Sequence, residues 1–323
     1  MITVDQIYNK IIENESSKQN FYRWLGASLI GSECTRYVAL KFYCAFEENF
    51  SGRILRVFEN GHQAEPRIIH DLELAGGKVH HEQMMIDAPD CLGHAGSTID
   101  GLIDIDGQTL LLELKTAKDD QWKKYADPEK TLKETNIRYY AQVQVNMHLT
   151  QTQKALWCCE NKDTNELYIE YIDYNCADAQ RYLALMTQVV NGYCGEKVSE
   201  ISSFYKCKMC GARDVCHGKK LPRVHCLTCA NSQAIAGGKF KCVRWDKEIP
   251  SEHLCNACGE HVFNPNFIPL ELVNYGEYYC TYRLANGKLL CNCAVESFPK
   301  LCDGEMQEVL ISTDWAKKEN PYE

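Results

Sequence analysis

The pattern of hydrophobic and polar residues predicts two β-strands near the middle of the chain. The segments STIDGLIDI, residues 97–105, and TLLLELKTA, residues 109–117, are joined at Asp106-Gly107, a strong two-residue turn signal. The later segment RYYAQVQVNMHLTQTQ, residues 138–153, is predicted as a helix despite its valines. The pattern therefore predicts a hairpin followed by a helix.

Further helices and strands are predicted on both sides of this hairpin along the chain. RVFENGHQAEPRIIHDLELAGG, residues 56–77, has apolar residues at helical spacing and ends at a Gly-Gly pair. VALKFYCAF at residues 38–46 is typical of a buried helix face, and ADAQRYLALMTQVVNGYCGE at residues 177–196 predicts another helix. KALWCCENKDTNELYIEYIDY at residues 154–174 predicts a second strand pair. This order of elements predicts an α/β core.

The pattern changes after Cys216. A short basic linker, HGKKLPRV, contains Pro222, and the chain then becomes rich in cysteine and poor in helical periodicity. A length of 323 residues also exceeds the usual single core. We therefore expect a first domain, a Cys-rich second domain and a C-terminal extension, at residues 1–218, 219–302 and 303–323.

Composition and charge restrict the class of protein. Hydrophobic residues make up 45% and charged residues 24% of the chain, as in an ordinary globular protein, and the formal net charge is −9. This charge argues against a nucleic-acid binder held mainly by bulk electrostatics, but it leaves room for a local basic groove. The N-terminus has no basic start followed by an apolar run, and no segment approaches 18 consecutive apolar residues. We therefore expect a soluble, unexported protein without a membrane partner.

The chain has 19 cysteines, and in an intracellular protein CxxC spacings more often bind metal than form disulfides. In FYKCKMCGARDVCHG, residues 204–218, the cysteines Cys207, Cys210 and Cys216 are spaced as metal ligands. A closed zinc site or a [4Fe–4S] cluster usually takes four protein ligands. The spacing alone leaves the fourth ligand and the metal open.

A second group of ligand candidates lies in HCLTCANS, FKCVRW and LCNACGEH. Its two CxxC pairs, separated by a loop, have zinc-ribbon spacing. The group supplies more donors than one zinc ion needs, namely Cys226, Cys229, Cys242, Cys255, Cys258 and His261. Such a ribbon either binds DNA or a partner, or stabilises a small domain that has little core of its own. No role is assigned to four further cysteines, Cys280, Cys291, Cys293 and Cys302.

The predicted hairpin carries a candidate catalytic group. Glu113 and Lys115 are two residues apart on a strand, so their side chains leave the same face of the sheet. Asp100 can share a site with Glu113 across the hairpin, and two carboxylates can hold a hard cation such as Mg²⁺. Lys115 could then position or deprotonate a water for attack on a phosphodiester. A surface Glu–Lys pair on an edge strand is the alternative.

The spacing Asp-x12-Glu-x-Lys, with an acidic helix before it and a Gln-rich helix after it, resembles the PD-(D/E)XK nuclease superfamily over about residues 25–216. STIDGL, LLLELKTA and YYAQVQVNMHLT look like the YqaJ and lambda-exonuclease branch, with RecB-like relatives. The resemblance implies a restriction-endonuclease-like core, in which a mixed sheet is flanked by helices. It implies that Mg²⁺ or Mn²⁺ is held by Asp100, Glu113 and the backbone carbonyl of Leu114. The implied catalytic residues are Glu65, Asp100, Glu113, Lys115 and Gln142, with Gln144 as second choice for the glutamine.

Other polar residues near these motifs are left outside the predicted site. Asp104 is a rival carboxylate in the hairpin that matches the family less well, and Asp106 is better used in the turn. Four histidines could reach a metal but more often pack or are solvated, namely His62, His70, His80 and His81. Three residues at the start of the following helix either hold DNA or belong to the core, namely Arg138, Tyr139 and Tyr140.

A further resemblance concerns the cysteines. AddB and the four-cysteine CRISPR adaptation nucleases have one cysteine far N-terminal and three far C-terminal, spaced C-x2-C-x5-C. This chain is similar, because Cys34 in IGSECTRY is followed two positions on by the basic Arg36. The resemblance implies that a [4Fe–4S] cluster clasps the ends of the nuclease domain through Cys34, Cys207, Cys210 and Cys216. Four thiolates can also bind zinc in place of the cluster. Cys44 is the alternative to Cys34 as the N-terminal ligand.

The Cys-rich tail resembles the tails of phage-type nucleases, which keep a single middle cysteine and a CxxH ending. This resemblance implies zinc ligands at Cys226, Cys229, Cys242 and Cys258, with His261 and Cys255 as alternates. A plain ribbon would instead use both CxxC pairs.

These resemblances imply a metal-dependent DNA exonuclease that hydrolyses phosphodiester bonds in phage-type recombination, repair or DNA-end processing. They imply Mg²⁺ or Mn²⁺, a [4Fe–4S] cluster and Zn²⁺ as cofactors, and DNA ends and a recombinase or helicase as partners. The expected location is the cytoplasm of a bacterium or of a phage-infected host. The alternative is a non-catalytic DNA-binding or assembly protein that recruits partners through its ribbon. Intact Asp100, Glu113 and Lys115 favour the enzyme.

Overall fold

The computed structural model describes residues 2–18, 24–276, 279–283, 287, 289–293 and 310–311. Apart from residues 310–311, the predicted extension at 303–323 lies outside the described residues, and so does Cys302. The chain divides into two compact units. The first unit comprises Met1–Asn20, Leu25–Ser32 and Asn49–Thr187, and the second comprises Phe21–Trp24, Glu33–Glu48 and Gln188–Glu323.

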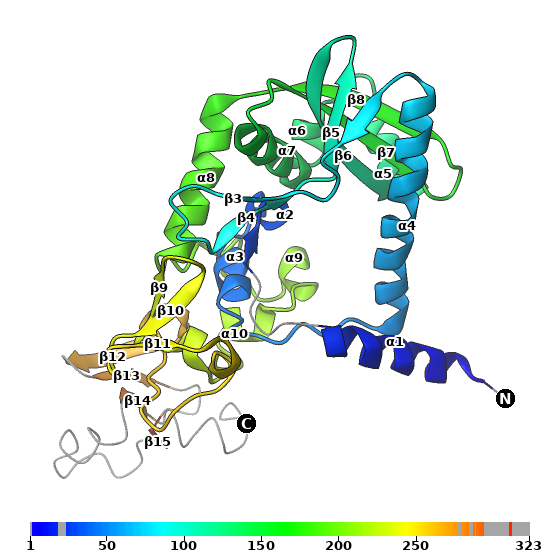
Figure 1. The fold of residues 1–323 in the computed structure, drawn as a ribbon. Helices are drawn as coiled ribbons and strands as arrows, with labels where there is room; N and C mark the ends of the chain where they lie inside the picture. Colours follow the sequence, from blue (N-terminus) through cyan, green and yellow to red (C-terminus); the bar gives the residue numbers. More distant parts are fainter. Residues whose placement is uncertain are drawn as a thin grey trace, which may run out of the picture. The chain divides into compact units, whose positions relative to one another are not determined.

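A mixed β-sheet forms the centre of the first unit (Figure 1). Its strands lie in the order β2-β5-β6-β7-β8, and β6 pairs antiparallel with β5 and parallel with β7. The strands span Lys78–His80, Gly101–Ile105, Gln108–Ala117, Lys154–Asn161 and Leu167–Asp173. Two long helices that pack against the sheet are α4, Gly52–Leu74, and α7, Ile137–Thr150. The strand β6, which carries the Glu-x-Lys motif, therefore lies inside the sheet and not at its edge.

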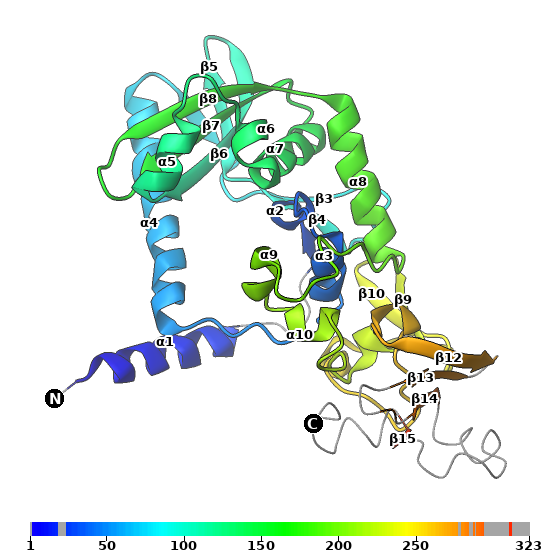
Figure 2. The same cartoon turned by 180° about the vertical axis from the view of Figure 1, so that it is seen from behind.

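The two helices cover opposite faces of this sheet. Successive residues of β6 point to opposite sides, so Leu112 packs with Ile68 of α4 while Leu111 packs with Val143 of α7. Figures 1 and 2 show α4 and α7 on the two sides of the strands. The predicted α/β core, a mixed sheet flanked by helices, is confirmed.

The turn of the predicted hairpin is confirmed, but its first strand begins at Gly101 and not at Ser97 as predicted. Asp106 and Gly107 have φ angles of 51° and 78°, the left-handed values that a two-residue hairpin turn requires. Residues Ala95–Thr98 form β4, which belongs to a separate small sheet with β1, Leu25–Gly26, and β3, Met85–Asp87. The break falls at Asp100, because its Oδ2 accepts the hydrogen bond of the Leu114 backbone amide at 2.7 Å in place of a main-chain acceptor.

The predicted helices are present with small shifts of their bounds. The helix α4 begins after Ser51, whose side chain accepts a hydrogen bond from the Ile54 amide, and it ends just before Gly76, which has a φ of 102°. The remaining helices of the first half of the chain are α1, Val4–Lys18, α2, Ala27–Ile30, α3, Thr35–Phe42, α5, Asp119–Tyr125, and α6, Leu132–Thr135, and α8 follows at Cys176–Val190. No helix in the described part of the chain is long and apolar enough to cross a membrane.

The second unit consists of short elements that surround two groups of cysteines. The helix α3 contacts α10. Two small sheets follow, in the orders β11-β10-β9 and β12-β13-β14-β15. The bounds are α9, Tyr205–Lys208; α10, Arg213–Cys216; η1, Cys226–Thr228; β9, Ser232–Ile235; β10, Lys239–Cys242; β11, Lys247–Ile249; η2, Ser251–His253; η3, Pro265–Phe267; β12, Glu271–Gly276; β13, Tyr279–Arg283; β14, Leu289–Cys293; and β15, Leu310–Ile311.

Candidate active site

A groove of about 370 Å³ opens in the first unit beside the second half of β6. Hydrophobic and polar side chains share its wall, which suits a ligand with both apolar and charged parts. It is lined by Leu114, Lys115 and Thr116 of β6, by Val57, Phe58, Gly61, His62, Glu65 and Ile68 of α4, by Tyr139 of α7, and by Lys162.

Three charged residues of the predicted site meet beside this groove. The Lys115 Nζ donates a hydrogen bond to Glu113 Oε1 at 2.5 Å and lies 3.8 Å from Asp100 Oδ2. The alternation of β6 places Glu113 and Lys115 on one face, as predicted, and the bond from the Leu114 amide fixes Asp100 against the same strand. The two carboxylates therefore share one ammonium and lie close enough to act on one ligand.

Burial and neighbouring charges shift the pKa values of Glu113 and Lys115. The side chain of Glu113 is 0% exposed, and this burial raises its pKa to about 7, against the charge of Lys115, which lowers it. Burial alone would lower the pKa of Lys115, but the charges of Glu113 and Asp100 outweigh it and raise that pKa. Since Glu113 is buried on an inner strand, the alternative of a surface pair on an edge strand is wrong.

One face of α7 supports the charged group. Tyr139, Gln142 and Asn146 are spaced three and four residues apart, so they lie on the same helix face. Asn146 Nδ2 donates a hydrogen bond to Glu113 Oε2 at 3.1 Å, and the Tyr139 ring centroid lies 5.5 Å from Lys115 Nζ. The motif analysis missed Asn146, although its position four residues after Gln142 could have indicated it.

The two candidate glutamines differ in their surroundings. Gln144 is fully buried and acts in the scaffold, because its side chain donates to the Asp173 carbonyl at 3.0 Å and accepts from the Asn175 amide at 2.7 Å. Gln142 is 7% exposed and lies on the helix face that carries Tyr139 and Asn146. The preference for Gln142 over Gln144 stays a prediction, and these contacts favour it.

Glu65 faces the groove from α4. Its Oε2 accepts a hydrogen bond from Gln83 Nε2 at 3.1 Å. Burial raises the pKa of Glu65, the charge of Asp100 raises it further, and His62 and Lys115 lower it. The pKa of Glu65 therefore depends on the charges of Asp100 and Lys115.

Some residues left outside the predicted site have contacts of their own. Asp104 accepts a hydrogen bond from Thr109 Oγ1 at 2.7 Å, while His62 and Tyr139 line the groove.

The four cysteines of the predicted clasp all belong to the second unit. Burial raises the pKa of Cys210, and the thiols of Cys34 and Cys207 raise it further. Burial likewise raises the pKa of Cys216 to about 11, with Arg36 opposing this shift and Cys34 adding to it. The Cys34 thiol thus acts on both Cys210 and Cys216, although 172 residues separate it from Cys207, the first cysteine of that group. Cys44 Sγ instead contacts the Phe42 carbonyl at 3.9 Å.

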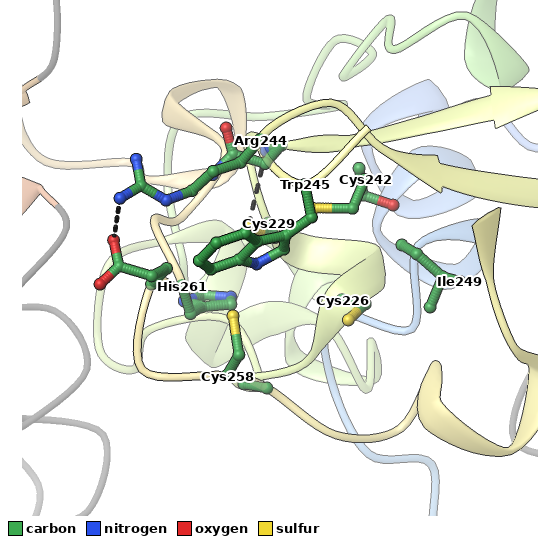
Figure 3. A pocket seen from close by; sticks show the side chains of 12 residues that line it. Cys226, Cys229, Cys242, Arg244, Trp245, Ile249, Cys258 and His261 are labelled. Carbon is green, nitrogen blue, oxygen red and sulfur yellow. Dashed lines mark hydrogen bonds and ion pairs between the residues drawn. The ribbon is translucent and has the colours of Figure 1, made fainter. Parts of the chain in front are cut away.

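A second group of cysteines lines a small cavity of about 20 Å³ (Figure 3). Trp245 and Arg244 also line it, and Arg244 pairs with Glu260 at 2.6 Å. Cys255 is exposed and lies outside this lining. Burial raises the pKa of Cys226 to about 11 and lowers that of His261 to about 4, so His261 is a neutral imidazole. The candidate ligands at the cavity are Cys226, Cys229, Cys242, Cys258 and His261.

Side chains that lie near one another do not by themselves form a metal-binding site. Within the ranges that the structure describes, no three or more His, Cys, Asp or Glu side chains form a group that could hold a metal ion as they stand. In donor chemistry, both cysteine groups suit a thiophilic metal, and the pair of Asp100 and Glu113 suits a hard cation.

Comparison with solved structures finds low similarity. The alkaline exonuclease LHK-Exo from Laribacter hongkongensis is 15% identical with a TM-score of 0.40, over 56% of this chain and 90% of that chain. LHK-Exo in complex with dAMP is 16% identical with a TM-score of 0.35, over 52% and 89%. The protein SSO0001 is 15% identical with a TM-score of 0.37, over 64% and 92%. None of the curated proteins matches the chain.

The family match is specific to one segment. Residues 44–153 match the family described as the YqaJ-like viral recombinase domain. This segment contains Glu65, Asp100, Glu113, Lys115 and Gln142. Apart from Lys162, the residues that line the groove therefore lie in a segment similar to the YqaJ-like viral recombinase domain, the branch that the sequence motifs indicate.

Proposed function

We propose that this protein is a metal-dependent DNA exonuclease that acts in phage-type recombination or DNA-end processing. The observation that carries the proposal is the buried Glu113–Lys115 pair with Asp100 beside it, within the segment that matches the YqaJ-like family. A buried ion pair adds little to stability compared with a well-packed apolar pair. A non-catalytic protein would therefore have little reason to keep this group beside a groove.

Asp100, Glu113 and the Leu114 backbone carbonyl would hold Mg²⁺ or Mn²⁺. These are oxygen donors, which hard divalent cations prefer, and a cation would relieve the buried charge of Glu113. When bound, such a cation neutralises charge on phosphate oxygens and lowers the pKa of water. The choice of Mg²⁺ or Mn²⁺ follows from this donor chemistry.

The surrounding side chains supply positioning and charge. Lys115 presents its ammonium to the groove, where it can orient an attacking water and stabilise charge on a phosphate. Asn146 holds Glu113 through its hydrogen bond, and the ring of Tyr139 lies beside Lys115. Glu65 and Gln142 would complete the site from α4 and α7. Lys162 lines the same groove and adds a further cation for the DNA backbone.

Exonuclease action has a direct test. Wild-type protein with Mg²⁺ should degrade linear DNA from its ends and leave covalently closed circular DNA intact, because an exonuclease acts only from a free DNA end. Cutting of the closed circle at a similar rate would show an endonuclease. Binding of both DNA forms without any cutting, with either Mg²⁺ or Mn²⁺, would favour the non-catalytic assembly protein.

The affinity for a divalent cation should depend on pH through Glu113. Since burial raises the pKa of Glu113 to about 7, the carboxyl is mostly protonated at pH 6, and a cation must displace that proton. We expect Mn²⁺ affinity to be roughly tenfold lower at pH 6 than at pH 8, with a plateau above about pH 8. Electron paramagnetic resonance of free Mn²⁺ measures this. An affinity that is equal at the two pH values would contradict the role of Glu113.

Asn146→Leu should lower kcat by about 10- to 100-fold, since Glu113 Oε2 loses its donor and its orientation. It should also lower the free energy of unfolding by about 1–3 kcal/mol, because a buried acceptor loses its bond. Gln144→Leu is the matched control on the same helix and should lose stability but keep kcat. Equal losses of kcat in Asn146→Leu and Gln144→Leu would show that Asn146 acts only on stability and does not position Glu113.

We further propose a [4Fe–4S] cluster at Cys34, Cys207, Cys210 and Cys216, and Zn²⁺ at Cys226, Cys229, Cys242 and Cys258. The influence of Cys34 on Cys210 and Cys216 supports the first set, and the shared cavity of the second four cysteines supports the second set. His261 is the alternate zinc ligand, because it lines the same cavity, and Cys255 is the less favoured one, because it does not. The tail could also recruit a recombinase or helicase.

The predicted domain boundary after residue 218 stays a prediction, and contacts within the second unit give it a sharp test. The Arg36 side chain donates to the Asn266 carbonyl at 2.7 Å, and the rings of Tyr43 and Phe267 lie 4.9 Å apart. The His225 ring contacts the Cys44 carbonyl at 2.9 Å. Ending the chain after Gly218 removes these partners, so we expect a lower melting temperature and less bound iron. A truncated protein with full iron and unchanged stability would show an independent tail.

A further inference from the structure

Two adjacent histidines face each other at the end of β2, outside the lining of the groove. The Nδ1 atoms of His80 and His81 lie 2.6 Å apart. His81 has a φ of 56°, a left-handed value that is uncommon for histidine, and this turn brings its ring back toward its neighbour. The two rings therefore present nitrogen atoms to one point at the surface.

A carboxylate fixes the orientation of the first ring. His80 Nε2 lies 3.2 Å from Asp104 Oδ1, and the same oxygen accepts a hydrogen bond from Thr109 Oγ1 at 2.7 Å. In the tautomer with the proton on Nε2, His80 donates to Asp104, and its Nδ1 lone pair accepts a hydrogen bond from His81 Nδ1. Metal-binding histidines commonly donate their second ring nitrogen to a carboxylate in this way.

We propose that His80 and His81 form a nitrogen site for a late first-row divalent cation such as Ni²⁺ or Zn²⁺, with water in the remaining positions. Bonds of about 2.0–2.1 Å to one cation place two neighbouring nitrogens roughly 3 Å apart, so the nitrogens must separate by a few tenths of an ångström and the rings must turn until both lone pairs point at the cation. The proton between the rings moves to His81 Nε2, and both imidazoles stay neutral. Asp104 then supplies negative charge behind the first ligand.

The site is linked to the groove through a short loop. Met84 N donates to the His81 carbonyl at 3.3 Å, and Gln83 between them donates to Glu65 at 3.1 Å. Gln83 also has a left-handed φ, of 53°. A cation on the histidine pair would brace the loop that holds Glu65. This link to catalysis rests on the proposed function, whereas the metal site itself does not.

Native mass spectrometry of the full-length protein, with its cysteine sites already loaded, can count added Ni²⁺. We expect the wild type to take up one Ni²⁺ more than His81→Ala, and Asp104→Asn to weaken that uptake by about tenfold or more. His70→Ala, which changes an exposed histidine on α4, is the matched control and should bind as the wild type does. Equal uptake by the wild type and His81→Ala, or an equal loss in His70→Ala, would overturn the proposal.

Hydrogen exchange gives a second readout that needs no nuclease activity. Ni²⁺ should slow exchange at the amides of residues 81–84 in the wild type and leave them unchanged in His81→Ala. Exchange that is the same with and without Ni²⁺ in the wild type would overturn the proposed bracing of the loop. Failure of DNA cleavage would leave both measurements interpretable, so the two proposals can fail separately.

Discussion

Glu113→Gln and Lys115→Ala should each reduce DNA cleavage by about 10³-fold or more while DNA binding persists. Glu113 is the buried carboxylate that would hold the cation, and Lys115 carries the ammonium between it and Asp100. Their charges act mainly on the transition state, where negative charge develops on the phosphate, so kcat should fall far more than affinity. Single-turnover cleavage of end-labelled DNA, together with a binding titration, measures the two effects separately.

Lys123→Ala is a suitable control for this pair of variants. Lys123 also bonds a carboxylate, Asp119, but its side chain is 68% exposed in a surface pair one helical turn apart. Such pairs contribute little, so both cleavage and stability should stay near the wild-type values. Full activity in either Glu113→Gln or Lys115→Ala would exclude hydrolysis at this site.

Cys34→Ser should remove the brown iron–sulfur absorbance and lower the melting temperature. A cluster that joins Cys34 to Cys207 closes a loop with 172 residues between its ends. By the chain-entropy model, a cross-link over such a loop stabilises the fold by up to about 5 kcal/mol. Because this rivals the net stability of a whole domain, cluster loss and unfolding should occur together.

Cys44→Ser provides the matched control for the clasp. Cys44 lies ten residues further along the chain, and its Sγ contacts the Phe42 carbonyl, so its loss should cost far less stability. Iron content and thermal unfolding of anaerobically purified protein measure both variants. A full complement of iron with wild-type stability in Cys34→Ser, or zinc alone in the wild type, would contradict the clasp.

Local patterns predicted the elements that local physics determines. The Asp106-Gly107 turn needs two left-handed residues, and β6 alternates so regularly that Glu113 and Lys115 had to share a face. The helix α4 ended at its Gly-Gly pair for the same reason, because Gly76 adopts a φ that other residues avoid.

Features that depend on distant contacts were not predictable in this way. The pattern did not reveal that Asp100 interrupts the strand, since this depends on the Leu114 amide across the hairpin. The bond from Asn146 to Glu113 depends on how α7 packs on the sheet. Arg36 was chosen for its position beside Cys34, yet its side chain bonds the carbonyl of Asn266, which no spacing rule indicates.

The most direct test of the central claim is cleavage by anaerobically purified wild-type protein of end-labelled single- and double-stranded DNA. The reaction should be run with Mg²⁺ or Mn²⁺ and, in parallel, with a chelator. The account predicts progressive loss of nucleotides from DNA ends with the metals and none with the chelator. Equal cleavage in the presence of the chelator, or intact DNA under all conditions, would contradict it.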